Sequence, residues 1–349
     1  MTRSIFTGLA LAALMASGAQ AQQLLTAETA APNTTPGISI ISLSEAAANA
    51  GVANIQVTAG QTLTNSVQNV AEGKSDIAAA PFILPFFLSR GVGPYASLGA
   101  EAGGELADNL AVLYTYRISV QGLYAYDSSN VSGWDDIEGK TIYNGPPRGA
   151  ALSNARLLIK TVTGLDEGTG FTGVQVNWGQ AVKTIQDGSA DAFVLPQSFP
   201  DPRVSAAVSS GNLTLFSMPK EAFESEGFSN VANIAGTVKF SMPVADMGYA
   251  NVEGVSIVSE DDTFRGPATV GADIVNTSMD FDTAKALTAA FLANIESIYH
   301  AKAPFMAVTW HGETDPAITD MCGPNPLKYH PGAVAAWEEA GYTLPDCAK

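Results

Sequence analysis

The sequence predicts an α/β fold, because segments typical of strands and helices alternate along the chain. The run ANIQVTAG (53–60) is rich in residues that favour strands, and it leads into TLTNSVQNVAEG (62–73), whose apolar residues recur at helical spacing. A second strand, SDIAAAPF (75–82), follows directly. Strand, helix and strand in this order favour a parallel sheet covered by helices.

The later segments repeat the same order. NLAVLYTYRISVQGLYAYD (109–127) reads as two strands separated by a bend, and KTIYNG (140–145) is a strand that precedes the helix ALSNARLLIKTVTG (151–164). GVQVNW (173–178) is the next strand. It leads into the helix GQAVKTIQDG (179–188), which ends at a glycine before the strand ADAFVL (190–195).

Ligands of such sheets settle at the carboxyl ends of strands, beside helix N-termini. Three turns of this kind are present, at residues 58–66, 143–150 and 176–180. We therefore expect a binding site to be assembled from these turns.

The middle turn contains Arg148, in the run GPPRGA just before a helix. The first N–H groups of a helix and its macrodipole already carry partial positive charge, so an added cation is unfavourable unless an anion binds there. The glycine pattern of a phosphate-binding loop is absent, which favours a carboxylate over a phosphate. The alternative is that Arg148 pairs with a surface Asp or Glu.

The two ends of the sequence indicate an exported protein. Residues 1–21 contain a basic residue, an apolar run and a small-residue site ending at Ala21, as in a cleaved signal peptide. No later stretch reaches the roughly 20 uninterrupted apolar residues of a membrane span. In an oxidising compartment, Cys322 and Cys347 are expected to form one disulfide, with two free thiols as the alternative. We expect a soluble periplasmic protein.

The net charge of the chain argues against some classes of partner, and its length predicts the number of domains. The chain carries 34 acidic and 17 basic residues, a formal net charge of −17, which makes nucleic acid and anionic membranes poor partners. A mature length of about 330 residues suggests two domains of roughly 100–200 residues each.

Four segments occur in the order seen in one family of transport receptors. They are VTAGQTLTNSVQNVAEGKSDIA (57–78), DDIEGKTIYNGPPRGAALSNARLL (135–158), AVKTIQDGSADAFV (181–194) and YHPGAVAAWEEAGY (329–342). With the export signal, they make the chain resemble the TAXI family of solute-binding receptors, which serve tripartite ATP-independent periplasmic (TRAP) transporters.

This resemblance implies a two-lobed periplasmic binding protein of type II, each lobe a mostly parallel sheet flanked by helices, with the ligand in the cleft between them. It places residues 22–126 and 250–349 in lobe I and residues 127–249 in lobe II. It also implies membrane-embedded TRAP permease subunits as partners. Two loops depart from the family: TAETAAPNTTPG (26–37) replaces a glycine-rich loop, and Pro147, Arg148 and Gly149 replace small residues.

Other function classes fit the sequence less well. No metalloprotease, nucleophile-elbow or paired-cysteine motif is present, so an enzyme is not expected, and neither is a metal or another cofactor. His330 precedes a proline and a glycine at a predicted helix start, where capping is favoured over catalysis. A receptor of an ABC importer, binding a sulfonate or a pyrimidine-type precursor, is the second hypothesis.

The candidate ligand-binding residues all lie at strand ends or helix starts. They are Thr62, Asn65, Tyr143, Asn144, Arg148, Gly149, Ala150, Trp178, Gln197 and Ser198. Several also have a structural interpretation: Thr62 and Asn65 can cap a helix, Tyr143 and Trp178 can be core, and Gln197 and Ser198 can pack at a hinge. Arg117 is a further cation, for which a salt bridge at a strand edge is the favoured interpretation. The expected ligand is a small organic acid or amino acid, and the resemblance favours glutamate-like compounds or 2-oxo acids.

Overall fold

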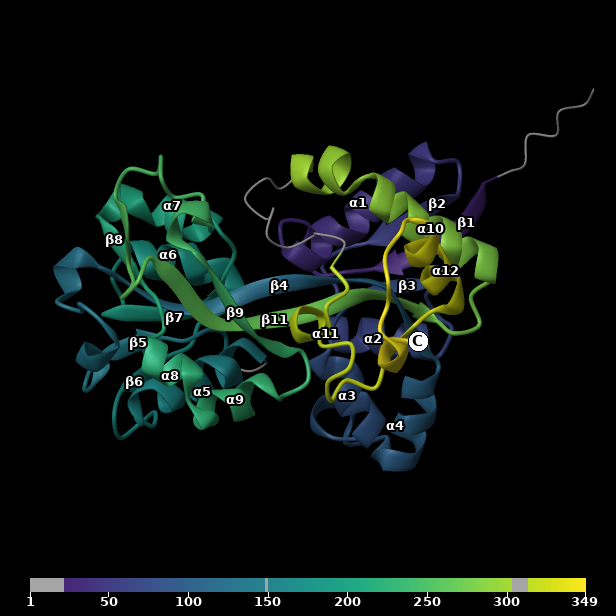
Figure 1. Cartoon of the computed structure of the whole chain (residues 1–349). Helices are drawn as coiled ribbons and strands as arrows, with labels where there is room; N and C mark the ends of the chain where they lie inside the picture. The colour runs from purple at the N-terminus through teal and green to yellow at the C-terminus, as the bar shows by residue number, and fades with distance from the viewer. Residues whose placement is uncertain (1–21, 148–149, 303–312) are drawn as a thin grey trace, which may run out of the picture.

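The computed structural model describes residues 22–147, 150–302 and 313–349. Its strands form one curled sheet in the order β2-β1-β3-β11-β4-β7-β5-β6, with β8, β9, β10 and β12 paired beside this path. Figure 1 shows two lobes of helices and strands, joined by the long strands β4 (Leu110–Tyr126) and β11 (Thr263–Asn276). The predicted signal peptide, residues 1–21, lies outside the described residues.

The first lobe is built on three parallel strands. These are β1 (Gln23–Glu28), β2 (Ala53–Thr58) and β3 (Ile77–Pro81). Helices α2 (Leu63–Ala71), α3 (Ile83–Arg90) and α4 (Gly99–Asp108) lie on one side of the strands, and α1 (Thr35–Asn49), α10 (Phe281–Ala293) and α12 (Pro331–Glu339) lie on the other (Figure 1). A π-helical segment, Ile295–His300, continues α10. The predicted strand, helix and strand at residues 53–82 are therefore confirmed.

The second lobe repeats this arrangement with shorter strands. The parallel strands are β5 (Thr141–Tyr143), β6 (Thr172–Val174) and β7 (Ala192–Gln197), and β8 (Leu213–Phe216) pairs in parallel with β10 (Val255–Val258). The helices are α5 (Ala150–Thr163), α6 (Ala181–Gln186), α7 (Pro202–Ala207), α8 (Lys220–Glu224) and α9 (Glu226–Ala232). Its strands and helices at residues 140–195 also confirm the prediction.

The buried apolar side chains form two clusters. The larger one is centred on β1, β3, β4 and β11 and continues into the second lobe through side chains such as Phe193 and Leu213, and the smaller one, within the second lobe, includes Trp134, Leu158, Phe171 and Phe228. Sheets with helices on both sides bury apolar residues on both faces, which explains the alanine-rich, fully buried run of β3. The predicted α/β fold class is confirmed.

The segment 109–127 was predicted as two strands with a bend, and this prediction is wrong. It forms the single strand β4, which changes partners along its length: Leu110–Arg117 pair with the C-terminal half of β11, and Val120–Tyr126 pair with β7 and β8. The register against β11 shifts between Thr269 and Val270, so a β-bulge absorbs the irregularity without ending the strand. The N-terminal half of β11 pairs with β9 (Thr237–Pro243).

The C-terminal segment is fastened to the first lobe. Cys322 and Cys347 form the expected disulfide, with their Cα atoms 5.5 Å apart. Between them lie β12 (Lys328–Tyr329), which pairs with β4, and helix α12; helix α11 (Pro316–Thr319) precedes them. The Trp337 indole on α12 donates to the carbonyl of Leu113 at 3.0 Å.

His330 caps helix α12, as the sequence suggested. Its Nδ1 accepts from the Gly332 N–H at 3.1 Å, and its Nε2 lies 3.1 Å from the carbonyl of Met279. Burial lowers the pKa of His330, which keeps the ring neutral and Nδ1 able to accept. Among the described residues, no helix combines the length and the apolar character needed to cross a bilayer.

Candidate functional site

The candidate site lies where β4 passes from one lobe to the other. Two small hollows lie there, and Arg117 lines both of them. The first hollow is also lined by Thr115, Glu313 and Thr319, and the second by Ser119, Gln197 and Ser198. A cation on a strand shared by two lobes is well placed to contact a ligand held between them.

Arg117 is half-buried and remains charged. Its guanidinium carbon lies 5.3 Å from the centroid of the Phe240 ring, a cation–π contact with β9. Burial lowers the pKa of Arg117, whereas the charge of Glu313 raises it. Arginine stays protonated in proteins, so Arg117 brings a fixed positive charge to the centre of an acidic molecule.

Gln197 and Ser198 lie at the end of β7, where the second hollow begins. Gln197 pairs with Val120 of β4, and its side chain is 1% exposed. Ser198 is half-buried, and its N–H donates to Asp201 at 3.2 Å. The sequence placed both residues at the crossing between the lobes. They do line a hollow together with Arg117.

An arginine that the sequence analysis missed, Arg203, anchors the strand ends of the second lobe. Its guanidinium pairs with Asp201, Nη2 to Oδ2 at 2.8 Å and Nε to Oδ1 at 3.1 Å, and also donates to the carbonyl of Pro196. Burial acts to lower the pKa of Arg203, but the charge of Asp201 outweighs this effect and raises the pKa. The available signal was a cation in the first turn of a helix, the same signal that singled out Arg148.

Arg203 also connects two of the predicted site residues. Its guanidinium carbon lies 5.5 Å from the ring centroid of Trp178, which is 43% exposed and stands at the start of a 3-10 turn. Tyr143, at the end of β5, is fully buried and donates to the carbonyl of Val176 at 3.4 Å. Burial raises the pKa of Tyr143 to about 12, against a lowering influence of Arg203. Trp178 offers an exposed ring to a ligand, and Tyr143 is part of the core.

Asn144 is committed to a polar network inside the second lobe. Its Nδ2 donates to Glu167 at 2.7 Å, and its Oδ1 accepts from Gln175 at 2.8 Å. Glu167 also takes two hydrogen bonds from Arg156, which lower the pKa of the Glu167 carboxyl. The side chain of Asn144 is therefore already satisfied by neighbours.

The remaining candidates lie at two helix starts. Thr62 is the N-cap residue of α2 but makes no side-chain capping bond, and both Thr62 and Asn65 are exposed. In the second lobe, Ala150 begins α5. Arg148 and Gly149 lie outside the described residues, so their role stays a prediction.

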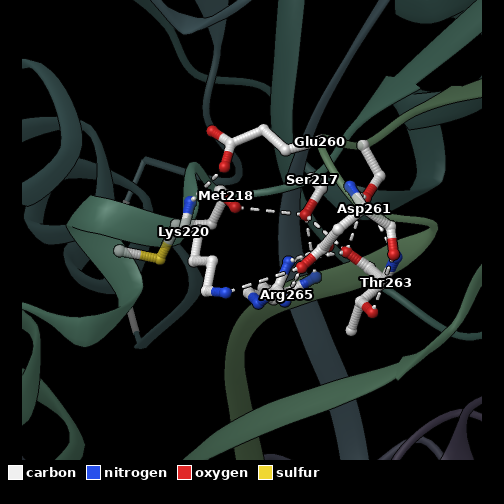
Figure 2. Close-up of polar contacts among 8 residues, drawn as sticks. Ser217, Met218, Lys220, Glu260, Asp261, Thr263 and Arg265 are labelled. Atoms are coloured by element: carbon white, nitrogen blue, oxygen red, sulfur yellow. Dashed lines mark hydrogen bonds and ion pairs between the residues drawn. The ribbon is translucent and has the colours of Figure 1, made fainter.

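A second polar cluster fastens the loop between β10 and β11 to the ends of β8 and α8 (Figure 2). Arg265 makes two hydrogen bonds of 2.7 Å to the carboxylate of Asp261 and lowers the pKa of that carboxyl. Ser217 accepts from the Arg265 N–H at 3.0 Å and donates toward the carbonyl of Thr263. The donors and acceptors of this cluster satisfy one another, which gives it a structural role.

A buried carboxylate lies in the core of the first lobe. Asp273 on β11 is 0% exposed and accepts hydrogen bonds from Tyr114 at 2.5 Å, Tyr116 at 2.9 Å and Ser39 at 2.9 Å. Tyr299 lies 3.0 Å from the Tyr114 hydroxyl. Burial raises the pKa of Asp273 to about 7, although the three donors act to lower it.

No group of three or more His, Cys, Asp or Glu side chains able to hold a metal occurs within residues 22–147, 150–302 and 313–349. The side chains gathered at the candidate site are those of Arg117, Gln197 and Ser198, with Arg203 and Trp178 at the neighbouring strand ends. Together they offer cations, hydrogen-bonding groups and an aromatic surface, as in a site that binds an organic anion.

Comparisons with known proteins give one family and several distant structures. The NMT1-like family matches residues 36–341. A comparison with curated proteins found no match. The chain is similar to the periplasmic aliphatic sulphonate binding protein SsuA from Escherichia coli, with 12% identity, 82% of this chain and 81% of that chain covered, and a TM-score of 0.44.

Two further solved structures are TRAP periplasmic solute binding proteins. The protein from Rhodobacter sphaeroides shares 12% identity, with 91% of this chain and 90% of that chain covered and a TM-score of 0.44. The protein from Desulfovibrio salexigens, with bound orotic acid, shares 10% identity, with 94% and 88% covered and a TM-score of 0.44.

Proposed function

We propose that this chain, which belongs to the NMT1-like family, is a periplasmic solute-binding receptor that captures a small carboxylate and delivers it to a membrane permease. It acts by binding and release, without catalysis. The ligand class is an organic acid or amino acid, and the TAXI resemblance of the sequence adds glutamate-like compounds and 2-oxo acids as first candidates.

The position of Arg117 carries this proposal. It is a fixed cation beside two hollows, on a strand that changes partners from one lobe to the other. A net charge of −17 repels acidic solutes in general, so a local positive site is needed where one is to bind. Arginine suits a carboxylate because its planar fork makes two parallel hydrogen bonds.

The carboxyl ends of the second-lobe strands contribute further side chains that could contact a ligand near Arg117. Trp178 presents its ring beside Arg203, and Gln197 and Ser198 follow at the end of β7. An aromatic side chain among a few polar groups is typical of a small-molecule site. The predicted anion site of Arg148 and the start of α5 extends this set in our proposal.

We further propose that the two lobes close on the ligand about the crossing of β4 and β11. Strand partners change at residues 117–120 of β4 and 269–270 of β11. These positions favour a lobe boundary inside the two strands, a few residues before the boundary of 127 and well beyond the boundary of 250 that the sequence suggests. Those two boundaries remain predictions.

The permease partner is proposed to be of the TRAP type, in keeping with the TAXI-like segments of the sequence. The competing hypothesis is an ABC importer for a sulfonate or a pyrimidine-type precursor. Genes beside the receptor gene separate the two: an ATPase subunit supports the ABC importer, and a permease without an ATPase supports TRAP.

A thermal-shift screen of the mature protein tests the receptor function. The panel contains organic acids, amino acids, sulfonates and betaines. A ligand at 100 times its dissociation constant adds about 2.7 kcal/mol to the free energy of unfolding, a shift that is easy to detect. Stabilisation by carboxylates supports the proposal, whereas stabilisation by sulfonates alone contradicts the ligand class.

A further inference from the structure

The second hollow beside Arg117 is lined by Gln197, whose side chain has a buried acceptor to which the proposed function assigns no partner. This hollow lies between β4 and the end of β7. Its polar lining consists of Arg117, Ser119, Gln197 and Ser198. It is small, so it admits a single functional group of a ligand and not a whole molecule.

The amide of Gln197 has a defined orientation. Its Nε2 donates to the carbonyl of Gly122 at 3.3 Å. The nitrogen also packs closely on Gly122, since a Cβ atom placed on this glycine would lie 3.3 Å from it. Turning the amide over would bring its oxygen against the Gly122 carbonyl, which places two acceptors together. Hydrogen-bond partners are the ground on which amide orientation is assigned. Nε2 therefore faces Gly122, and Oε1 is left for another partner.

Oε1 of Gln197 has no hydrogen-bond partner among the residues that the structure describes. The side chain is 1% exposed, so bulk water does not satisfy this oxygen. Buried polar atoms in folded proteins nearly always have partners, and an unmatched acceptor at a ligand site indicates a donor on the ligand.

The charge of Arg117 limits which donor fits. An ammonium group in the same hollow would be repelled by the guanidinium. An oxo group would offer a second acceptor to Oε1. A hydroxyl group is neutral and donates, and a carboxylate beside it is attracted by Arg117.

We propose that Gln197 selects hydroxy acids: the ligand carboxylate is attracted by Arg117, and a neighbouring hydroxyl donates to Oε1 of Gln197. This inference rests on the proposed function as a carboxylate receptor. It narrows the ligand class, because it places hydroxy acids ahead of the 2-oxo acids and amino acids that the sequence resemblance suggests.

Calorimetric titration of the full mature chain with matched acids tests the inference. The probes share three skeletons: lactate, pyruvate and alanine; 2-hydroxyglutarate, 2-oxoglutarate and glutamate; mandelate, phenylglyoxylate and phenylglycine. For the skeleton that binds tightest, we expect the hydroxy acid to bind at least about tenfold more tightly than its oxo and amino counterparts.

Gln197→Met removes the acceptor at similar volume, and it is expected to reduce the preference to within about threefold. Gln197→Glu keeps an acceptor and adds a negative charge, so all acids should weaken while the preference for the hydroxy acid persists. Gln121→Met is the matched control. Gln121 is 3% exposed and donates to the Val194 carbonyl at 3.2 Å, and it does not line the hollow. This control should keep both affinity and preference, and melting temperatures verify that each variant folds.

The possible failures are distinguishable. If acids bind but the oxo and hydroxy members of each skeleton bind equally, the hydroxy-acid inference is overturned and the receptor function stands. An unchanged preference in Gln197→Met, with the fold intact, overturns it as well. If none of the nine acids binds, the proposed carboxylate receptor and the inference both fail.

Discussion

At the scale of single residues, two arginines compete for the role of main anion ligand. Arg148 was singled out by its place before a helix, and Arg117 by its place beside the two hollows. A strand-edge salt bridge was the favoured interpretation of Arg117 from sequence. The structure puts this residue at the centre of the candidate site and near the charge of Glu313. Substitutions can separate the two arginines.

We predict that Arg148→Ala weakens binding of the best acid from the screen by roughly 2–5 kcal/mol, the cost of truncating one partner of a desolvated charge pair. Arg148→Lys should lose less, because it keeps the charge but not the planar fork. Calorimetric titration measures both. Lys160→Ala on helix α5, which follows Arg148 in the sequence, is the control, since Lys160 pairs with exposed Asp166. Binding of Arg148→Ala within about threefold of wild type would show that Arg148 is a surface residue.

Asp273 predicts a pH dependence of stability. Its pKa is about 7 in the folded chain against an ordinary value of 3.8, so the folded chain binds this proton more tightly. The resulting stability is fully present below about pH 4 and is lost as the pH rises through about 7, at up to about 1.4 kcal/mol per pH unit. Asp273→Asn removes the titration.

Urea unfolding of wild type and Asp273→Asn between pH 4.5 and 7.5 measures this effect. Other titrating groups, such as Asp320 with its pKa raised to about 6 by burial, cancel in the comparison. The stability of wild type relative to Asp273→Asn should fall as the pH rises. A constant difference between the two proteins would show that Asp273 does not titrate in this range.

At the scale of elements, β4 and the C-terminal segment hold the first lobe together. The sequence suggested two strands separated by a bend in segment 109–127. The single strand instead continues through Arg117, Ile118 and Ser119, because the chain is hydrogen bonded to new partners beyond this point. In the C-terminal segment, β12 pairs with β4, and α12 is bound to β4 by the hydrogen bond from the Trp337 indole to the Leu113 carbonyl.

The disulfide should stabilise this segment substantially. Cys322 and Cys347 are 25 residues apart, and closing a loop of this length restricts the unfolded chain by roughly 3–4 kcal/mol in the chain-entropy model. We predict that the double variant Cys322→Ser, Cys347→Ser unfolds at correspondingly lower urea. Ser297→Ala, an exposed hydroxyl outside the loop, serves as the control. Equal unfolding midpoints would contradict a stabilising role.

The export signal is tested by mass. Intact-mass measurement of protein purified from periplasm should place the mature N-terminus at residue 22. Alkylation without reductant should add no mass, because both cysteines are bonded. A chain that keeps residues 1–21 would refute the predicted cleavage.

At the scale of the whole molecule, two lobes joined by the two long strands β4 and β11 favour a hinge (Figure 1). Hinge motions are concentrated in a few backbone positions while packed bodies stay rigid. The change of partners near residues 117–120 and 269–270 provides such positions, and Arg117 and Gln197 lie beside them. Closure would therefore bring both lobes onto the ligand.

We predict that a saturating ligand from the screen lowers the radius of gyration measured by small-angle scattering. Closure of two rigid lobes makes the molecule more compact and removes the solute from water. An acid that does not stabilise the protein in the thermal-shift assay serves as the control. The same radius with and without saturating ligand would argue against hinge closure.

The sequence by itself determined the α/β class, most strands and helices, the cysteine pair and the cap at His330. Each of these depends on local information: residue spacing, turn residues and the chemistry of neighbouring positions. The family resemblance added a two-lobed receptor as an expectation, and it favoured the turns at strand ends as the place to search for a site.

Only the tertiary structure decided which side chains meet. Arg117 and Gln197 share a hollow because β4 and β7 pair in one particular register, and the position of each residue in the sequence does not encode that pairing. The same holds for the cation–π contact of Arg203 with Trp178, and for the hydrogen bonds that Tyr114 and Tyr116 donate to Asp273. Local patterns specify elements, but the contacts between elements depend on packing across the whole chain, and the candidate site consists of such contacts.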